Sequence, residues 1–223
     1  KAPALAPEGH RKIAWVAQHA PVLRAIAQRR LSDGSLRGRR VAMTIHLEAK
    51  TAYLAILLRE AGAEVTVSGS NPLSTQDAVC AALAERGVRV FATHDPSPEE
   101  FEGYLMRTIE TAPEIVIDDG AELVSRMVLH RPDLLQNVAG ASEETTTGVI
   151  KLRAMDEEGV LPFPVLAAND ARMKHLFDNR YGTGHSSIAS IVSNTNLFLS
   201  GKVVVVMGFG WVGRGLARYA DGM

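Results

Sequence analysis

The chain has 223 residues, 46% of them hydrophobic and 22% charged, so it is long enough to bury one large core and to begin a second. Lys and Arg number 24 against 25 Asp and Glu, which leaves no net field to attract a nucleic acid or an anionic membrane. The composition therefore argues against a nucleic-acid or membrane partner and favours a small molecule.

Apolar residues at helical spacing between Ile13 and Ala27 predict helices first, after an irregular, proline-spaced start at residues 1–8. From residue 40 onward, apolar runs alternate with helical patterns, which is typical of an α/β fold with a doubly wound parallel sheet. The predicted strands are residues 40–47, 63–68, 88–93, 114–117 and 164–168, and the predicted helices are residues 49–61, 77–86, 98–111 and 169–179.

The single cysteine, Cys80, lies in one of these helices, so no disulfide can form within the chain. No acidic residue or histidine with a clear role accompanies it, and we interpret it as a small buried hydrophobe rather than a nucleophile. The sequence shows no signal peptide and no apolar run of membrane length. A soluble protein of the reducing cytoplasm is expected.

A glycine motif near the end of the chain follows a run of four valines and a methionine, residues 203–207. These residues predict a buried strand, and residues 216–220 predict a helix after the glycines. Gly208 would allow a tight turn, Gly210 would let the backbone approach a pyrophosphate, and Gly213 would let helix and strand pack closely. The pattern matches a dinucleotide-binding fingerprint.

The acidic residue that binds the ribose hydroxyl in such fingerprints lies about 20 residues further on, which is beyond Met223. We therefore expect the chain to stop within a second domain. The predicted division is a substrate-binding domain at 1–182, a linker or hinge helix at 183–200, and the first βα unit of a Rossmann NAD-binding domain at 201–223.

Polar residues that follow the predicted strands should converge on one rim, because ligands of parallel sheets bind outside the carboxyl ends of the strands. His46 is either an ordinary hydrogen-bonded histidine or a proton shuttle, and a metal site with Glu48 is not favoured because further ligands are missing. Asp118 and Asp119 are either helix caps or functional carboxylates. The rim segments are residue 46 and residues 71–77, 118–120 and 142–148.

Lys174 and Asp178 are four residues apart in a predicted helix, close enough to interact. A solvated surface ion pair worth less than about 1 kcal/mol is one reading. Beside an oxidised sugar, the same lysine could act as a general acid or base. The pair alone does not decide between these alternatives.

Several segments together resemble the S-adenosyl-L-homocysteine hydrolase family, in the order and spacing of that family. The most specific is Glu143-Glu144-Thr145-Thr146-Thr147-Gly148, and the resemblance covers roughly residues 10–223. His46-Leu47-Glu48 and the residues from Gly210 to Gly215 are similar to the archaeal and thermophilic bacterial branch. The other matching segments are residues 71–77, 118–120, 177–182 and 208–215.

The resemblance implies a reversible, redox-neutral hydrolysis of S-adenosyl-L-homocysteine to adenosine and L-homocysteine through a 3′-keto intermediate, with tightly bound NAD as oxidant and reductant. It also implies a homotetramer. By motif match, Lys174 and Asp178 would move protons, His46 would serve the leaving group and water, and Asp119, Glu144 and Glu48 would hold the nucleoside. NAD would be held by Thr145, Thr146, Thr147, Asn179, Gly208, Gly210, Trp211, Val212 and Gly213.

Many family members have Thr and Glu where this chain has Glu48 and Lys50, which leaves S-inosyl-L-homocysteine as an alternative substrate. An ordinary nicotinamide dehydrogenase and a non-catalytic NAD-binding paralogue are two further alternatives. Retention of Lys174, Asp178, Asp119 and Glu144 argues against the non-catalytic reading. The 223-residue chain alone is expected to be inactive.

Overall fold

The computed structural model describes residues 3–223, which divide into two compact units. Unit 1 ends at Leu166, and unit 2 is Ala167–Met223. This division by compactness differs from the functional boundary expected at residue 182, which stays a prediction.

Unit 1 is built on a parallel sheet in the strand order β3-β2-β1-β4-β5-β6. Met43 in the central strand lies beside Val67 on one neighbour and Ile117 on the other. The strands are β1 (Arg40–Ile45), β2 (Glu64–Gly69), β3 (Arg89–Phe91), β4 (Ile115–Asp118), β5 (Gly140–Glu143) and β6 (Val165–Ala167).

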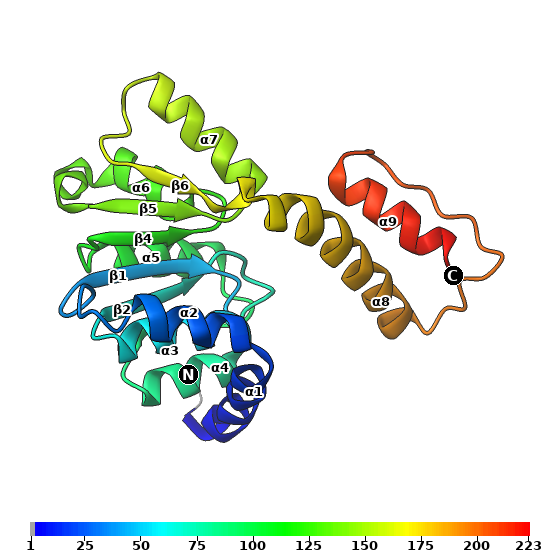
Figure 1. Cartoon of the computed structure of the whole chain (residues 1–223), viewed down its shortest axis with the longest axis horizontal. Coiled ribbons are helices and arrows are strands. Elements are labelled where there is room, and N and C mark those ends of the chain that lie inside the picture. Colours follow the sequence, from blue (N-terminus) through cyan, green and yellow to red (C-terminus); the bar gives the residue numbers. More distant parts are fainter. Residues whose placement is uncertain (1–2) are drawn as a thin grey trace. The chain divides into compact units, whose positions relative to one another are not determined.

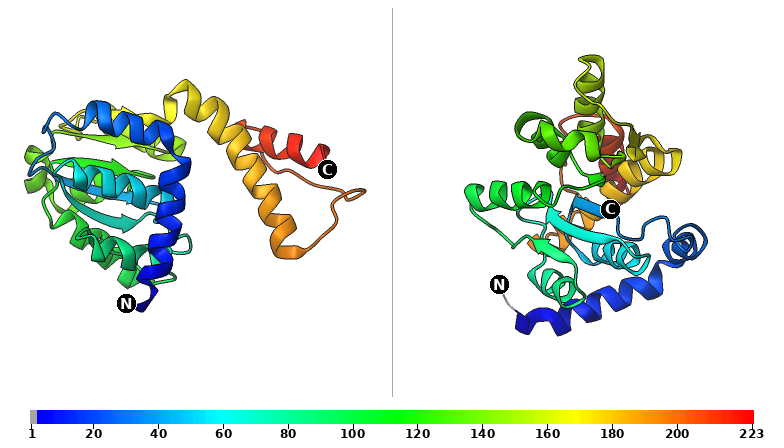
Figure 2. Two further views of the ribbon diagram at one scale, coloured as in Figure 1. Left: turned by 60° about the horizontal axis from the view of Figure 1, so that its bottom comes forward. Right: turned by 90° about the vertical axis from the view of Figure 1, so that its left-hand side faces the viewer.

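Helices cover both faces of this sheet, and each face has its own apolar core (Figures 1 and 2). Met43 packs with α1, α3 and α4, whereas its neighbour Ala42 points into the core formed with α5, α6 and α7, because successive strand residues face opposite sides. The doubly wound arrangement is thus confirmed. The helices are α1 (Ala6–His19), α2 (Pro21–Arg30), α3 (Ala49–Glu60), α4 (Asp77–Glu85), α5 (Pro98–Ile109), α6 (Glu122–His130) and α7 (Thr146–Glu157).

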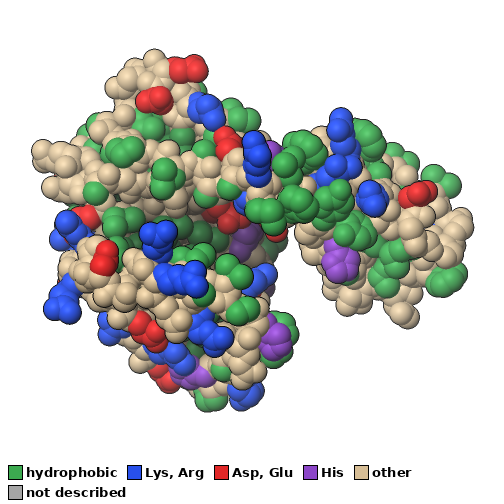
Figure 3. All heavy atoms as spheres, in the orientation of Figure 1, with side chains coloured by type: hydrophobic (Ala, Val, Ile, Leu, Met, Phe, Trp, Pro, Cys, Tyr) green, Lys and Arg blue, Asp and Glu red, His purple; other side chains and the backbone are tan. Residues whose placement is uncertain are grey.

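Three further observations concern the charged surface, the cysteine and the lengths of the helices. Over the face drawn in Figure 3, Lys and Arg side chains are interspersed with Asp and Glu. Cys80 is 7% exposed and burial raises the pKa of its thiol to about 12, which confirms a buried, unreactive side chain. Within residues 3–223, no helix combines the length and the apolar character needed to cross a bilayer.

Unit 2 contains α8 (Thr183–Thr195) and α9 (Trp211–Asp221), which pack against each other. The two helices approach closely at glycines: a Cβ on Gly184 would overlap the backbone of Gly215. The predicted linker at 183–200 is therefore helical over most of its length. A hinge function for it stays a prediction.

Three local predictions are wrong. The start of the chain is not irregular where it is described, since Pro3–Leu5 forms a 3₁₀ turn and α1 begins at Ala6, while residues 1 and 2 lie outside the described part. Residues 169–179 do not form one α-helix, because a 3₁₀ turn at Ala168–Asp170 precedes a π-helix at Lys174–Gly182. The third error is the strand at residues 203–207.

Residues 203–207 form no strand, and Val203 and Met207 are 92% and 95% exposed. A β-strand is stable only when its N–H and C=O groups pair with a neighbour, and within residues 3–223 nothing pairs with this segment. The β-branched run therefore indicates a preference for extended backbone but does not by itself produce a strand. The helix after the glycines is confirmed, although it begins at Trp211.

A substitution at Gly9 tests how closely α1 packs on the rest of unit 1. Its Cα lies so close to α4 that an added Cβ would overlap the carbonyl oxygen of Ala78. We expect Gly9→Ala to lower the free energy of unfolding by roughly 1–3 kcal/mol through overpacking. Gly103→Ala is the matched control, because it lies inside α5 with open space around it and should raise stability by about 0.5–1 kcal/mol. Urea unfolding of both variants measures the difference, and equal effects would contradict the packing.

Candidate functional site

The rim at the carboxyl ends of β1 and β4 is the point where the winding of the sheet reverses. The strand order places β1 beside β4, with β2 and β3 on one side and β5 and β6 on the other. Ligands of such sheets bind in the crevice at this reversal. His46 follows β1 and Asp119 follows β4, so both predicted site residues lie at the switch point.

Asp119 and His46 face each other across this rim. Asp119 is 7% exposed, and its Oδ2 accepts a 2.6 Å hydrogen bond from the Ser70 hydroxyl. The same Oδ2 lies 3.6 Å from His46 Nε2, while His46 Nδ1 lies 2.6 Å from the Ser74 hydroxyl. A buried carboxylate, an exposed imidazole and two hydroxyls thus form one polar cluster that could bind sugar hydroxyls and move protons.

Asp118 has a different task from its neighbour. It is 1% exposed and accepts hydrogen bonds from the backbone N–H groups of Leu123 and Val124, in the first turn of α6. Burial raises the pKa of its carboxyl to about 7, the Val124 N–H opposes this increase, and the nearby Glu143 charge adds to it. The structure therefore assigns the helix-capping alternative to Asp118, whereas Asp119 faces the rim.

Glu143 holds the two loops of the rim together. Its side chain is fully buried and accepts from the N–H groups of Gly120 and Ala121 after β4, at 2.8 and 2.9 Å. It also accepts from the N–H and the hydroxyl of Thr145, at 2.8 and 2.7 Å. The carboxylate also requires a glycine at position 148, because a Cβ there would overlap it. This residue matched the family motif, but its role in joining the two loops was not apparent from the sequence.

The three threonines at the start of α7 divide into one cap and two exposed residues. Thr145 is the N-cap: its hydroxyl accepts from the Gly148 N–H at 3.0 Å while donating to Glu143. Thr146 and Thr147 follow in the first helical turn and are exposed. Glu144 is half-buried, and its backbone N–H donates to the Asp118 carbonyl.

Glu48 also acts as a helix cap. Its Oε1 accepts from the N–H groups of Lys50 and Thr51 at the start of α3, at 2.9 and 3.3 Å. Together with Lys50 and Gln76, Glu48 lines a hollow of about 610 Å³. One oxygen of its carboxylate is therefore engaged by the backbone at the start of α3.

In unit 2, Lys174 lies at the centre of a group of amide and carboxylate oxygens. Its Nζ donates to Asn179 Oδ1 at 2.8 Å and to Asn169 Oδ1 at 3.4 Å, and lies 3.9 Å from Asp178 Oδ2. The wide turn of the π-helix brings the residue five positions on, Asn179, nearer than Asp178. Asn169, only 3% exposed, also accepts from Asn179 and fixes both side chains.

The glycine motif has the backbone that a phosphate-binding turn needs. Gly208 has φ +93°, as the predicted tight turn requires, and a Cβ on Gly213 would overlap the Gly208 carbonyl oxygen, so Gly213 packs closely on this turn rather than on a strand. Gly210 is the N-cap residue of α9 and has no side chain that could accept from the first N–H groups of the helix. A Cβ at this position would meet open space. Trp211 and Val212 begin the helix and are exposed. The first N–H groups of α9 are thus suited to an anion.

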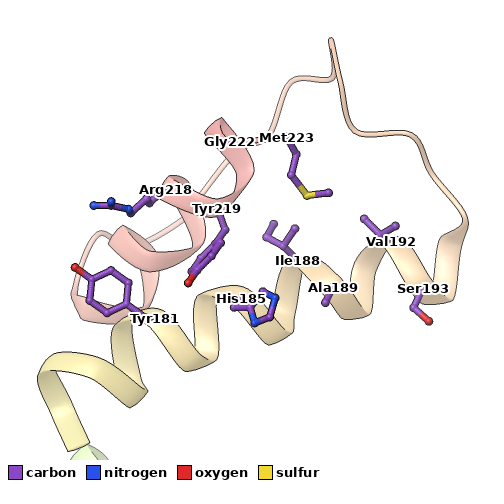
Figure 4. Close-up of a pocket in the computed structure, with 10 residues that line it drawn as sticks. All are labelled: Tyr181, His185, Ile188, Ala189, Val192, Ser193, Arg218, Tyr219, Gly222 and Met223. Atoms are coloured by element: carbon purple, nitrogen blue, oxygen red, sulfur yellow. The ribbon is translucent and has the colours of Figure 1, made fainter. Parts of the chain in front are cut away.

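A hollow of about 710 Å³ between α8 and α9 was not predicted (Figure 4). His185 and Tyr219 meet there with ring centroids 5.3 Å apart, and Ile188 and Met223 line it further along. No group of three or more His, Cys, Asp or Glu side chains within residues 3–223 is arranged to hold a metal ion.

The sequence model for S-adenosyl-L-homocysteine hydrolase matches residues 1–132 and 125–205 of this chain. The chain belongs to the S-adenosyl-L-homocysteine hydrolase family. It is 52% identical to an adenosylhomocysteinase of Pyrococcus abyssi, over 98% of this chain and 52% of the relative. It is also 51% identical to an S-inosyl-L-homocysteine hydrolase of Methanopyrus kandleri, over 99% of this chain and 52% of the relative.

An adenosylhomocysteinase of Thermotoga maritima is 50% identical over 96% of this chain and 53% of its own length. The chain therefore spans about half the length of the curated hydrolase relatives that it matches. Relatives named for adenosyl and inosyl substrates are equally similar, so overall identity does not distinguish the two bases.

Ser70, Ser74 and Asn169 are partners of the predicted site residues that the sequence did not reveal. Ser70 and Ser74 lie directly after β2, where polar residues were expected to face the rim, but serines are too common in loops to stand out. Asn169 was expected in a helix and lies instead in a 3₁₀ turn. These three residues can be recognised as part of the site only once the hydrogen-bond partner of each side chain is known.

Loss of the Glu143 carboxylate should loosen the whole rim. Glu143→Gln replaces one acceptor oxygen by an NH₂ group that faces backbone donors, so we expect a loss of about 3 kcal/mol in the free energy of unfolding. Glu157→Gln, exposed at the end of α7, is the control and should change stability by less than about 0.5 kcal/mol. Urea unfolding at neutral pH compares them, and similar midpoints would refute the central role of Glu143.

Asp118 should make stability depend on pH in an unusual direction. Its pKa is about 7 when folded and near 3.8 when unfolded, so the folded state holds the proton more tightly between these values. The free energy of unfolding should therefore fall as pH rises from about 4 to 7, by up to about 4 kcal/mol from this group. Asp118→Asn should remove that decline. Parallel pH slopes for the two proteins would show that the carboxyl stays ionised.

Proposed function

We propose that this chain supplies the nucleoside-binding part of an enzyme that reversibly hydrolyses S-adenosyl-L-homocysteine to adenosine and L-homocysteine. Family membership supports the reaction class. The observation that carries the proposal is the buried Asp119 carboxylate, 3.6 Å from the His46 imidazole at the sheet's switch point. A homotetramer is part of the proposal on the family resemblance alone.

At the rim, Asp119 and Glu144 accept hydrogen bonds from the ribose hydroxyls and the base, because ionised carboxylates offer only acceptors. Ser70 donates to Asp119 and so keeps its Oδ2 oriented. His46 serves the leaving sulfur and the incoming water, and its 52% exposure lets both reach the ring. Glu48 contributes to the same region through the oxygen that does not cap α3.

Lys174 acts as the general acid or base at the ribose 3′-hydroxyl, and Asp178 assists proton transfer at the 4′-carbon. The cluster of Asn169, Asn179 and Asp178 supports this role because it fixes a flexible amine at one position. Lys174 is 22% exposed and Asp178 64% exposed, so both side chains can be reached by a substrate.

The residues present fit NAD. The uncapped N-terminus of α9, the positive φ of Gly208 and the open space above Gly210 suit a pyrophosphate. When bound, NAD would supply the oxidation at the ribose 3′-hydroxyl and the later reduction that restores this hydroxyl. Thr146 and Thr147 are suited to hydrogen-bond it, since the Thr145 hydroxyl is already engaged with Glu143 and Gly148. Asn179 is a further candidate, because its amide has two N–H donors and gives one of them to Asn169.

Hydrolysis of S-inosyl-L-homocysteine is the second candidate function. Lys50 and Gln76 line the same hollow as Glu48, and Arg11 and Lys12 add two further donors. Such a surface favours the oxygen at position 6 of hypoxanthine over the amino group of adenine. The inosyl name of the Methanopyrus kandleri relative agrees with this alternative.

Thiol release tests the function directly. The complete gene product that contains this chain is purified and incubated separately with the adenosyl and inosyl thioethers, and free homocysteine is titrated. Release from either substrate supports the hydrolase, and the faster substrate identifies the base. No thiol from both would refute the proposal and leave the non-catalytic or dehydrogenase readings.

In that assay Lys174→Ala should lower kcat by about 10²–10⁴-fold, because a general acid or base is lost. Lys202→Ala removes an exposed lysine of the same unit and should leave kcat within about twofold. Circular dichroism of both variants checks the fold. A Lys174→Ala variant with full activity would exclude this residue from proton transfer.

A further inference from the structure

His46 is held by a short chain of hydrogen bonds that starts at a backbone carbonyl. Its Nδ1 lies 2.6 Å from Ser74 Oγ, and Ser74 Oγ lies 3.2 Å from the Asn71 carbonyl oxygen. The Asn71 side chain accepts from the Leu73 N–H at 2.9 Å, which keeps this turn in place. The series therefore runs from the Asn71 carbonyl oxygen through the Ser74 hydroxyl to His46 Nδ1.

The number of protons available decides which group donates in each of these hydrogen bonds. A serine hydroxyl carries one proton, and a carbonyl oxygen can only accept. If Ser74 donates to Asn71, its oxygen must accept from His46, so Nδ1 carries the ring proton. A neutral His46 then has a bare Nε2, and the state of one nitrogen is set by the bond that the other makes.

The bare Nε2 faces Asp119, which is also an acceptor. The 3.6 Å between Nε2 and Oδ2 is too long for a direct hydrogen bond, and Ser70 already donates to that oxygen. Two acceptors turned toward each other are best satisfied by a group with protons between them. A water molecule or a substrate hydroxyl meets this requirement.

We propose that Ser74 is a positioning residue that holds His46 in the Nδ1–H tautomer, so that Nε2 is the atom that exchanges protons at the site. Nε2 takes a proton from the water beside Asp119 as the water oxygen adds to the nucleoside, the ring becomes an imidazolium, and Nε2–H gives this proton to the sulfur of the leaving thiolate in the next turnover. Nδ1–H stays bonded to Ser74 throughout. The tautomer stands on the geometry of unit 1, whereas its use in turnover rests on the proposed function.

Nitrogen-15 NMR of the chain measures the tautomer without any activity. At about pH 8 an ordinary histidine is neutral, and protonated and bare ring nitrogens have distinct shifts. His94 is an internal reference, because its Nδ1 lies 3.0 Å from the Thr75 carbonyl, which can only accept. His46→Gln identifies the His46 signals.

We expect His46 to show the same Nδ1–H pattern as His94, and Ser74→Ala to lower the ratio of Nδ1–H to Nε2–H roughly tenfold at His46 alone. Ser74→Thr keeps a hydroxyl and should restore the ratio. An Nε2–H ring in the unaltered chain, or no change in Ser74→Ala, would overturn the proposal. Unchanged His94 signals show that the fold is intact.

Turnover by the complete protein then separates the tautomer from its use. Ser74→Ala should lower kcat at least tenfold with a smaller change in KM, and Ser74→Thr should recover most of it. A shifted tautomer with unchanged kcat would overturn the proton-transfer role. Absence of turnover in the unaltered protein would refute the proposed function, while the NMR result still decides the tautomer.

Discussion

The buried carboxylate of Glu143 is the interaction on which the rim of unit 1 depends. β4 and β5 pair in parallel with Asp118 opposite Glu143, so both strands end at the same level. A backbone that turns away at the end of a strand leaves N–H groups without ladder partners. Glu143 accepts from such groups in both loops at once, and therefore fixes the β4–α6 turn against the start of α7.

This constraint explains why neighbouring acids have different tasks. Alternation along the backbone turns Asp118 inward to cap α6, whereas Asp119 lies in the turn that Glu143 holds and faces Ser70 and His46. A site carboxylate is useful only when its position is determined by the groups around it. The buried acids thus supply the rigidity, and Asp119 supplies the chemistry that the proposed function needs.

The sequence predicted the parts of the fold in which a local pattern and a tertiary partner agree. Alternating strands and helices, the buried Cys80 and the turn at Gly208 are examples. The valine run at 203–207 failed because strand formation depends on a neighbour that periodicity does not reveal. The site was harder: periodicity cannot tell which of Glu143 and Glu144 points inward, nor that Asn179 approaches Lys174 through a π-helix.

We propose that these residues serve a hydrolysis in which bound NAD would be reduced and then restored. The decisive measurement is stopped-flow absorbance of reduced nicotinamide, recorded with thiol release in a single turnover of the complete protein. We expect a signal that rises before thiol appears and returns to its starting value as the nucleoside is formed. Thiol release with no rise at all, or reduced cofactor that accumulates without decay, would contradict it.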